Sequence, residues 1–503
     1  MNSKKDSFPI SSNYSLEEFK KIPEKKGLLP LVVSLSFDTE TPVSLYKKVA
    51  EGKAYSFLFE SAEKDESNGR YSIVGFDPIE KISFDDGKAI IEKKKGDKLK
   101  KEQEIQISIP GNKNNAKSSS ALEILAERIK EYDSVYAKEF FGGLVGFFSF
   151  ESMKYFEDIP FLPRQKGEAL DALFVVPRII IRFDHFSSEI SLAFFADLSK
   201  GRSEEFFTFQ EEVKKVIEKI KKPLKAEILD IPKGNEIFYK ENKFFEEQAR
   251  KAKEKIIAGE IFQVQISQRF TRSSKENPFE IYRRLRLRNP SPYMFFLDMK
   301  GCHIIGSSPE TLVRLKNKKI LLRPIAGTRK RGKDEAEDQK LEKELINNPK
   351  ERAEHAMLVD LARNDIGRVA KTGSVKVSRE FYVRKFSHVQ HILSDVEGEL
   401  KKDKNMFDVF RTSFPAGTLT GAPKIRATEI ITQLENIRRG IYGGGVGYFA
   451  FGGDMDFAIL IRSIFLANKE AHVQAAGGIV YDSTPKAESK ECAKKASACL
   501  SIL

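Results

Sequence analysis

The sequence predicts an α/β protein of the α+β type, with helices packed on large antiparallel or mixed sheets. Its 503 residues are 40% hydrophobic, which is enough for two or three domains with buried cores. Segments of alternating apolar residues are interspersed with helical patterns, and no repeat of fixed period is apparent. A charged stretch with two prolines, residues 220–235, separates two halves. We therefore expect an N-terminal arm at 1–27, one domain at 28–220 and a second at 235–503.

The first half reads mainly as strands. A short helix is expected near Leu16–Lys21, and a second over Thr41–Glu51 with Thr41 as its cap and Pro42 at its first position. Residues 93–120 are rich in Lys, Asn, Ser and Gly and are expected to form a surface excursion. The strands expected in this half are 28–35, 55–60, 71–77, 140–149, 175–183 and 190–195.

The second half opens with an amphipathic helix over 241–258, which Gly259 ends. One helix is expected over 349–368, and another closes the chain after the cap-and-start pair Thr484–Pro485. The strands expected here are 263–271, 294–299, 303–307 and 313–315.

Composition excludes several classes of protein. The formal net charge is +13, but the lysines are dispersed among glutamates, which is typical of a solvated surface and favours a small anionic substrate. A nucleic-acid-binding protein is the rival class, and no defined basic footprint supports it. No apolar run is long enough for a membrane helix, and no signal segment opens the chain. Three cysteines without a CxxC spacing indicate a reduced, cytoplasmic setting.

The helix at 349–368 carries the most chemical information. Glu351, Glu354 and His355 share one face, where two carboxylates and an imidazole repel one another unless a cation or a substrate proton joins them. This indicates a metal site or acid–base chemistry. For Glu351 an alternative stays open, in which Asn348 caps the helix and Glu351 completes a capping box. The closing helix has Glu488 and Glu491 on one face, which is typical of an exposed C-terminal helix, but combined with Glu354 this face could complete a site for Mg²⁺.

Glycine-rich segments and one buried charge are further candidates. Residues 324–329, 415–424 and 442–448 match neither a P-loop nor a dinucleotide fingerprint, yet each could offer backbone N–H groups to a carboxylate. Tight turns and bulges explain them equally well. Arg462 interrupts an apolar run, so it either binds an anion or forms a salt bridge in the core. His391 has apolar neighbours, which is typical of a core histidine.

In this order, these segments resemble component I, the large subunit of anthranilate synthase, among the chorismate-utilising enzymes. The resemblance runs from about Leu28 to the C-terminus. It is densest in Gly-Ser-Ser-Pro-Glu-Thr-Leu (306–312), Pro-Ile-Ala-Gly-Thr-Arg (324–329), Glu-His-Ala-Met-Leu-Val-Asp-Leu-Ala-Arg-Asn-Asp (354–365) and Pro-Ala-Gly-Thr-Leu-Thr-Gly-Ala-Pro-Lys (415–424). It implies a two-lobed fold with a regulatory domain at 28–220 and a chorismate-binding catalytic domain at 235–503.

The resemblance also implies roles for particular residues. Glu354 and Glu491 would hold Mg²⁺, which binds one carboxylate of chorismate. Glu351 would protonate the leaving C4 hydroxyl while ammonia attacks C2, and His391 and Thr418 would serve the elimination of pyruvate. The residues implied to contact substrate are Gly327, Thr328, Ala476, Gly477 and Gly478 around the metal-bound carboxylate, and Tyr442 and Arg462 at the enolpyruvyl carboxylate.

Two positions separate this chain from related enzymes. Family members that make aminodeoxychorismate carry Lys where Ala326 stands, and isochorismate-forming relatives carry Lys where we align Gln263. Ammonia therefore remains as the nucleophile, and aminodeoxychorismate synthase component I is the alternative assignment. Because no glutaminase cysteine elbow is evident, a separate glutamine amidotransferase subunit would supply ammonia, in a heterotetramer of two large and two small subunits.

A feedback site for tryptophan is implied as well. Ser61 closes a segment similar to the family's Leu-Leu-Glu-Ser, and Pro292, Tyr293 and Met294 match the second part of that site. Phe59 replaces the usual Leu. A second departure is Ala-Ala-Gly-Gly at 475–478, where the family has Ala-Gly-Ala-Gly, which moves the glycine that can take positive φ. The chain contains no tryptophan, consistent with synthesis under tryptophan scarcity.

Overall fold

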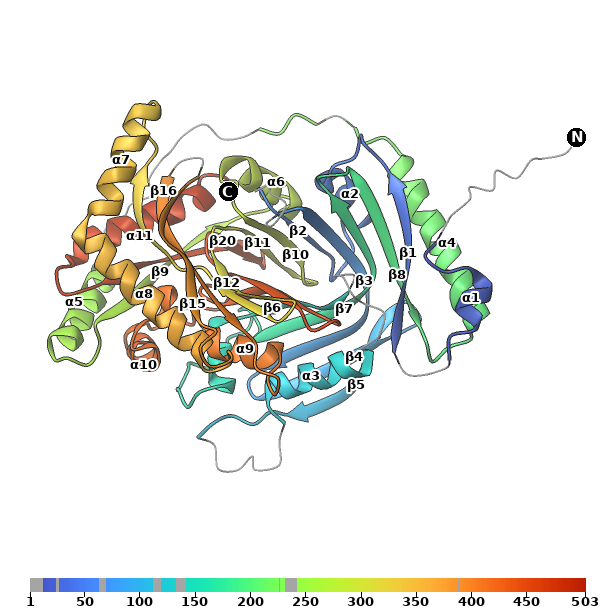
Figure 1. Cartoon of the computed structure of the whole chain (residues 1–503), viewed down its shortest axis with the longest axis horizontal. Coiled ribbons are helices and arrows are strands. Elements are labelled where there is room, and N and C mark those ends of the chain that lie inside the picture. Colours follow the sequence, from blue (N-terminus) through green and yellow to red (C-terminus); the bar gives the residue numbers. More distant parts are fainter. Residues whose placement is uncertain are drawn as a thin grey trace, which may run out of the picture.

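Two β-sheets that share a pair of long strands organise the protein (Figure 1). The computed structural model describes residues 12–23, 27–62, 69–111, 119–132, 142–225, 227–230, 242–386 and 389–503. Strands β3 (Tyr71–Asp85) and β7 (Ala172–Asp184) pair along almost their whole lengths. On its other edge, β7 pairs with β6 through its first half and with β8 through its second. The same two strands therefore belong to both sheets.

All the strand pairs that the structure describes between named strands are antiparallel. The first sheet runs in the spatial order β1 (Leu28–Ser36), β8 (Glu189–Asp197), β7, β3, β2 (Phe57–Glu60), β10 (Tyr293–Asp298), β11 (Cys302–Ser308), β20 (Ser463–Ala467), β21 (Glu470–Ile479), β9 (Gln263–Ser273) and β17 (Gly421–Ala422). The second sheet runs in the spatial order β5 (Lys98–Gln106), β4 (Lys88–Lys95), β3, β7, β6 (Gly143–Phe148), β18 (Gly445–Ala450), β19 (Met455–Ile459), β12 (Thr311–Lys316), β13 (Lys319–Leu322) and β16 (Val389–Glu399). Strands β14 (Ile325–Lys330) and β15 (Lys376–Lys385) also pair with β16.

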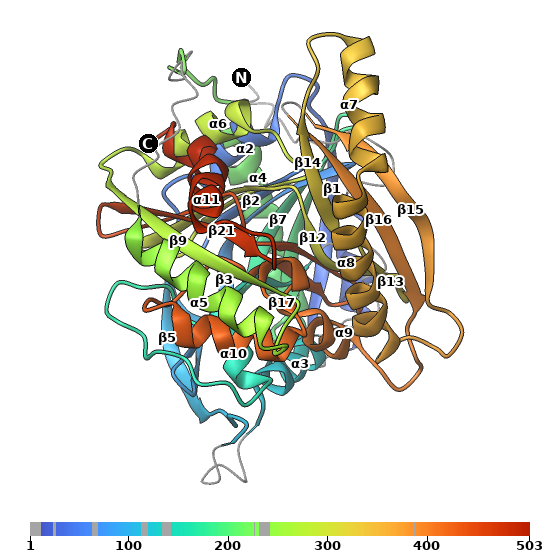
Figure 2. The same ribbon diagram turned by 90° about the vertical axis from the view of Figure 1, so that its left-hand side faces the viewer.

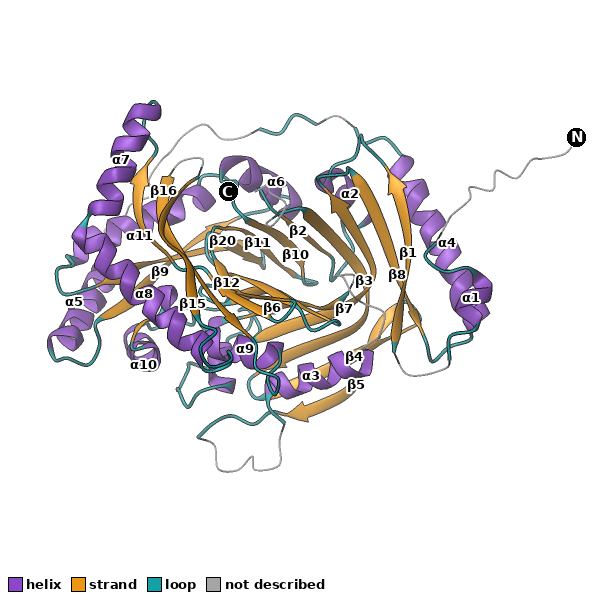
Figure 3. Ribbon diagram, viewed as in Figure 1, coloured by secondary structure: helices purple, strands orange, loops and turns teal. Residues whose placement is uncertain are grey.

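Two apolar cores bind the helices to the sheets (Figures 2 and 3). One core joins the first sheet to α1 (Leu16–Lys20), α2 (Pro42–Val49), α4 (Arg202–Lys221), α5 (Lys243–Ile257), α6 (Pro278–Arg288), α10 (Lys424–Leu434) and α11 (Pro485–Leu500). The other contains side chains of both sheets together with α3 (Ala121–Tyr132), α8 (Pro349–Gly367) and α9 (Met406–Ser413). Helix α7 (Glu335–Asn347) lies against β14, and the short 3-10 helices are η2 (Phe150–Tyr155) and η3 (Gly417–Leu419).

The two predicted halves of the chain share these sheets. Strand β2 pairs with β10 and β6 with β18, and each core draws side chains from both halves. The predicted boundary, 220–235, starts in the last turn of α4 and ends before α5, and its residues 226 and 231–235 lie outside the described residues. The division into a regulatory and a catalytic domain stays a prediction.

One stretch of the first half differs from expectation. The surface excursion predicted at 93–120 contains an edge strand, β5, whose side chains are nearly all exposed or half-buried. Because neither face of β5 is covered, its sequence shows no alternation of apolar and polar residues. In the described residues, no helix is both long and apolar enough to cross a membrane.

Candidate active site

Helix α8 places Glu351, Glu354 and His355 against different neighbours. Its N-terminus is capped as the sequence allows, since the Asn348 side chain accepts a hydrogen bond from the Glu351 N–H at 3.1 Å. The Glu351 carboxylate does not complete a capping box. It pairs instead with Arg329 of β14 at 3.0 Å. His355 is fully buried and bonds through Nε2 to Ser394 Oγ at 2.7 Å, so it supports the packing of α8 on β16.

Glu354 belongs to a group of carboxylates contributed by α8 and α11. Burial raises the pKa of Glu354, and the negative charges of Glu351 and Glu491 raise it further. Burial likewise raises the pKa of Glu488, with a contribution from Glu491. Burial also disfavours the charged form of Glu491, but Lys495, at 2.6 Å, lowers its pKa overall. The two predicted metal ligands, Glu354 and Glu491, are therefore close enough for their negative charges to repel each other, although they are 137 residues apart in the sequence.

A bulge in β14 holds three of the predicted residues together. The register between β14 and β16 shifts between Ala326 and Arg329, so Gly327 and Thr328 project out of the ladder. Gly327 has φ of 62°, which favours glycine, and a Cβ there would lie 3.0 Å from Glu351 Oε2. Its carbonyl accepts a hydrogen bond from His391 Nδ1 at 2.7 Å, and Thr328 Oγ1 lies 3.2 Å from the same nitrogen.

The electrostatics of His391 follow from this arrangement. Burial and, to a smaller extent, the positive charges of Arg462 and Lys495 together lower the pKa of His391 to about 4, so the ring is neutral at physiological pH. Since Nδ1 donates to the Gly327 carbonyl, the lone pair is on Nε2. His388, the other histidine of this segment, lies outside the described residues.

The Arg462 guanidinium and the neutral Tyr442 phenol form the side of the site opposite the carboxylates. Arg462 has φ of 51° between β19 and β20, and its Nη1 donates to the Lys495 carbonyl. Burial lowers its pKa, and nearby Tyr442 and Glu491 only partly offset that effect. No carboxylate among the described residues lies within ion-pair distance of Arg462. Of the two alternatives left by the sequence, binding an anion fits this better than a salt bridge in the core.

Strand β21 brings Ala476, Gly477 and Gly478 next to α11, which carries Glu488 and Glu491. The Ala476 carbonyl accepts a hydrogen bond from Lys495 at 3.1 Å. A Cβ on Gly477 would lie 2.9 Å from Glu488 Oε2, and one on Gly478 would lie 3.0 Å from the Gln263 amide. Both glycines leave room for neighbouring side chains, that of Glu488 on α11 and those of glutamines on β9.

Thr418 contacts a buried carboxyl, that of Glu310, which the sequence did not predict as a site residue. Its hydroxyl in η3 donates to Glu310 Oε1 at 3.0 Å. Glu310 has no charged partner among the described residues, and burial raises its pKa to about 8. It lines a cavity of about 40 Å³ together with Thr418 and Leu361 of α8. The only signal in the sequence is an acid directly before the apolar run of β12, within the segment 306–312.

The predicted inhibitor segments also meet. Glu60 pairs with Met294 across β2 and β10, and the Ala62 N–H bonds to the Ser291 carbonyl at 3.0 Å, which brings Ser61 next to Pro292. The Tyr293 hydroxyl lies 2.9 Å from Asp456 and 3.0 Å from Thr311.

Known proteins resemble this chain over nearly its whole length. The family model of the chorismate binding enzyme matches residues 54–501. Anthranilate synthase component 1 of Aquifex aeolicus is 41% identical over 504 residues, covering 98% of each chain, and that of Acetivibrio thermocellus is 38% identical over 497 residues, covering 97% of this chain and 98% of the relative.

Solved structures show the same fold. Anthranilate synthase component I from Streptococcus pneumoniae superposes with a TM-score of 0.73 at 33% identity, covering 92% of this chain and 98% of that one. The menaquinone-specific isochorismate synthase from Escherichia coli has a TM-score of 0.70 at 17% identity, covering 97% and 98%, and this likeness concerns the fold alone. The chain therefore belongs to the family of chorismate-binding enzymes.

Proposed function

We propose that this chain is component I of a cytoplasmic, Mg²⁺-dependent anthranilate synthase, a lyase that makes the first intermediate of tryptophan biosynthesis. The reaction converts chorismate and ammonia to anthranilate, pyruvate and water. One observation carries the proposal: an acidic group on α8 and α11 lies near the Arg462 guanidinium and the Tyr442 hydroxyl. Chorismate has two carboxylates, and the two groups provide a separate position for each.

The acidic group fits Mg²⁺. Glu354 and Glu491 are hard oxygen donors whose mutual repulsion a divalent cation would relieve, and Mg²⁺ takes few protein carboxylates while keeping positions for water and substrate. Among the described residues, no set of three or more His, Cys, Asp and Glu side chains is grouped closely enough to hold a metal without such additional ligands. The cation would neutralise and orient one substrate carboxylate. The bulge at Gly327 and Thr328 and the backbone at Ala476–Gly478 would line that position.

For protonation of the departing C4 hydroxyl, the geometry favours Glu310 over Glu351. Glu351 pairs with Arg329, an arrangement suited to a carboxylate that holds a loop in place. Glu310 is buried with no cationic partner in the part of the chain that the structure describes and, with a pKa of about 8, carries a proton at neutral pH. Thr418 orients it. A neutral carboxylic acid is what a leaving hydroxyl requires.

His391 suits the second half of the reaction. After amination at C2, loss of pyruvate requires removal of the C2 proton, cleavage of the C3–O bond and delivery of a proton to the enolpyruvyl methylene carbon. The neutral His391 ring is fixed by the Gly327 carbonyl and has a free lone pair on Nε2, so it can accept the C2 proton.

The nucleophile would come from outside the chain. Ala326 provides no amine, and the Gln263 amide, beside Gly478, cannot act as a base. We propose that a glutamine amidotransferase subunit delivers ammonia in a heterotetramer of two large and two small subunits, and that tryptophan inhibits by binding at Ser61 and residues 292–294.

The test combines the full chain with chorismate, ammonium chloride and Mg²⁺ at mildly alkaline pH. Blue anthranilate fluorescence together with pyruvate in equal amounts would support the proposal. A non-aromatic amino product without pyruvate would instead support aminodeoxychorismate synthase component I and overturn it. A reaction without Mg²⁺, in EDTA, checks the metal requirement.

A further inference from the structure

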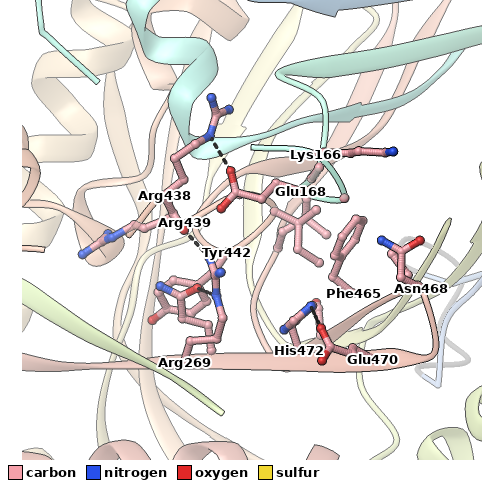
Figure 4. Close-up of a pocket in the computed structure, with 18 residues that line it drawn as sticks. Lys166, Glu168, Arg269, Arg438, Arg439, Tyr442, Phe465, Asn468, Glu470 and His472 are labelled. Atoms are coloured by element: carbon pink, nitrogen blue, oxygen red, sulfur yellow. Dashed lines mark hydrogen bonds and ion pairs between the residues drawn. The ribbon is translucent and has the colours of Figure 1, made fainter. Parts of the chain in front are cut away.

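A second cavity, of about 190 Å³, is lined on one side by Arg439 and Tyr442 (Figure 4). We call it the Arg269 cavity. Strands β9, β20 and β21 form one side, and the loop at 166–169 and residues 438–442 form the other. At roughly 10–15 Å³ for one water, it has room for about a dozen water-sized sites. None of the residues implied for metal, acid or base chemistry lines it, and only Tyr442 borders both places.

Two of the arginines at this cavity are already neutralised by carboxylates. Arg438 lies 2.7 Å from Asp171 and 3.7 Å from Glu168. Arg439 lies 2.6 Å from Glu435 and stacks over the Tyr442 ring. The charge of each guanidinium is therefore already paired, although the buried Arg438 Nε donates to no group in the described part of the chain.

Arg269 differs from both. Its Nε donates to the Gln474 side chain at 3.3 Å and its Nη2 to the Arg438 carbonyl, while Nη1 donates to no group in the described part of the chain. No described carboxylate lies within 4.0 Å of it. Burial lowers its pKa, which Glu168, Glu151 and Glu435 only partly counteract, but a guanidinium keeps its proton at neutral pH. Arg269 is thus a half-buried cation whose hydrogen-bonding capacity is not filled.

The other side chains that line the cavity indicate which chemical group could be attached to a bound anion. Phe465 and His472 are cross-strand neighbours on β20 and β21 with nearly parallel rings, 22° apart. The His472 ring is tied to Thr271 at 2.9 Å and is 3.8 Å from Glu470. The Phe465 ring and Leu460 provide an apolar side, so a fully hydrated inorganic anion would match only part of the lining.

We propose that the Arg269 cavity binds a small organic carboxylate, with its carboxylate group on the Arg269 guanidinium and its apolar body against Phe465. A carboxylate accepts two parallel N–H bonds from a guanidinium, which would use the free Nη1. The site is distinct from the positions proposed for chorismate and tryptophan.

Benzoate is a suitable probe, because it joins a carboxylate to a small apolar ring. We expect calorimetry on the full chain to detect binding on the order of 1 mM, and Arg269→Gln to weaken it about tenfold or more, since a charge-assisted hydrogen bond is lost. The matched control is Arg272→Gln on the same strand, where the arginine instead donates to the Leu500 carbonyl. This control should bind benzoate like the unaltered chain.

Three results would overturn the proposal: equal binding by Arg269→Gln and the unaltered chain, equal binding of uncharged benzamide, or tighter binding of inorganic phosphate. Loss of benzoate binding in Arg462→Gln with retention in Arg269→Gln would place the ligand in the catalytic site and overturn it as well. A second measurement does not depend on folding of a variant. Benzoate should protect Arg269 of the unaltered chain from modification by phenylglyoxal, and an unprotected Arg269 would refute the site.

Discussion

Glu354 is a half-buried carboxylate near two others, so its surroundings disfavour its ionised form unless a cation accompanies it. Because its folded-state pKa is raised, its contribution to stability is largest at low pH and is lost as the pH rises through that pKa. We predict that Glu354→Gln raises the melting temperature in EDTA at neutral pH. The same change should abolish the stabilisation by Mg²⁺ and reduce activity about a hundredfold or more.

Calorimetry with and without Mg²⁺ provides a readout besides turnover for this variant. Asp360→Asn is the matched control, because Asp360 is on the same helix but is exposed and pairs with Arg363 of that helix. It should behave like the unaltered chain. Retained activity, or retained stabilisation by Mg²⁺, in Glu354→Gln would remove Glu354 as a ligand.

Glu310 allows a test by pH. Burial raises its folded-state pKa to about 8, so the folded protein binds a proton that the unfolded chain releases near pH 4.5. The stabilising contribution is therefore complete below about pH 4.5 and is lost as the pH rises towards 8. We predict that Glu310→Gln flattens this part of the stability profile and lowers kcat about a hundredfold or more. An unchanged stability profile, measured by denaturant titration from pH 5 to 8, would contradict the buried neutral acid.

At the scale of elements, the site depends on how closely α11 approaches β21. A Cβ on Gly477 would lie 3.0 Å from the Cβ and 3.3 Å from the carbonyl oxygen of Glu488, closer than most Cβ contacts in proteins. We predict that Gly477→Ala displaces α11, which carries Glu491, and costs about 1–3 kcal/mol of stability and about tenfold in activity. Gly367→Ala at the end of α8 meets nothing within 4 Å and is the control, expected to be neutral or slightly stabilising. Thermal unfolding and anthranilate production would show both effects, and full activity in Gly477→Ala would refute the packing argument.

How far the sequence predicts the structure also differs by element. Helix α8 is predicted within one residue, because Asn348 and Pro349 give an explicit start signal and its acids share a face. The edge strand β5 is not predicted, because its side chains lack an apolar face. Glu310 is not predicted either, since a buried acid is recognised only from what surrounds it in space. His391 and Gly327 are 64 residues apart in the sequence, and only the β14–β16 pairing shows that they touch.

On the scale of the whole molecule, the shared sheets place the inhibitor segments near the proposed acid. The β2–β10 pairing joins Ser61 and its neighbours to Tyr293. The Tyr293 hydroxyl contacts Thr311 at 3.0 Å, and Thr311 directly follows Glu310 in the chain. A ligand that moves β10 can therefore alter the surroundings of Glu310 through a single hydrogen bond and one peptide unit. Inhibition by tryptophan would need no large rearrangement of the two sheets.

Ser61→Phe tests this connection. The larger side chain would alter the contact between the end of β2 and the turn before β10, while it leaves Glu310, Glu354 and Arg462 unchanged. We predict that the concentration of tryptophan for half-inhibition rises about tenfold or more, with activity in its absence changed by less than about twofold. Ser203→Phe, at an exposed position of α4, is the control and should retain normal inhibition. If Ser61→Phe lost activity and inhibition together, the segment would support the catalytic site directly and the regulatory assignment of this region would fail.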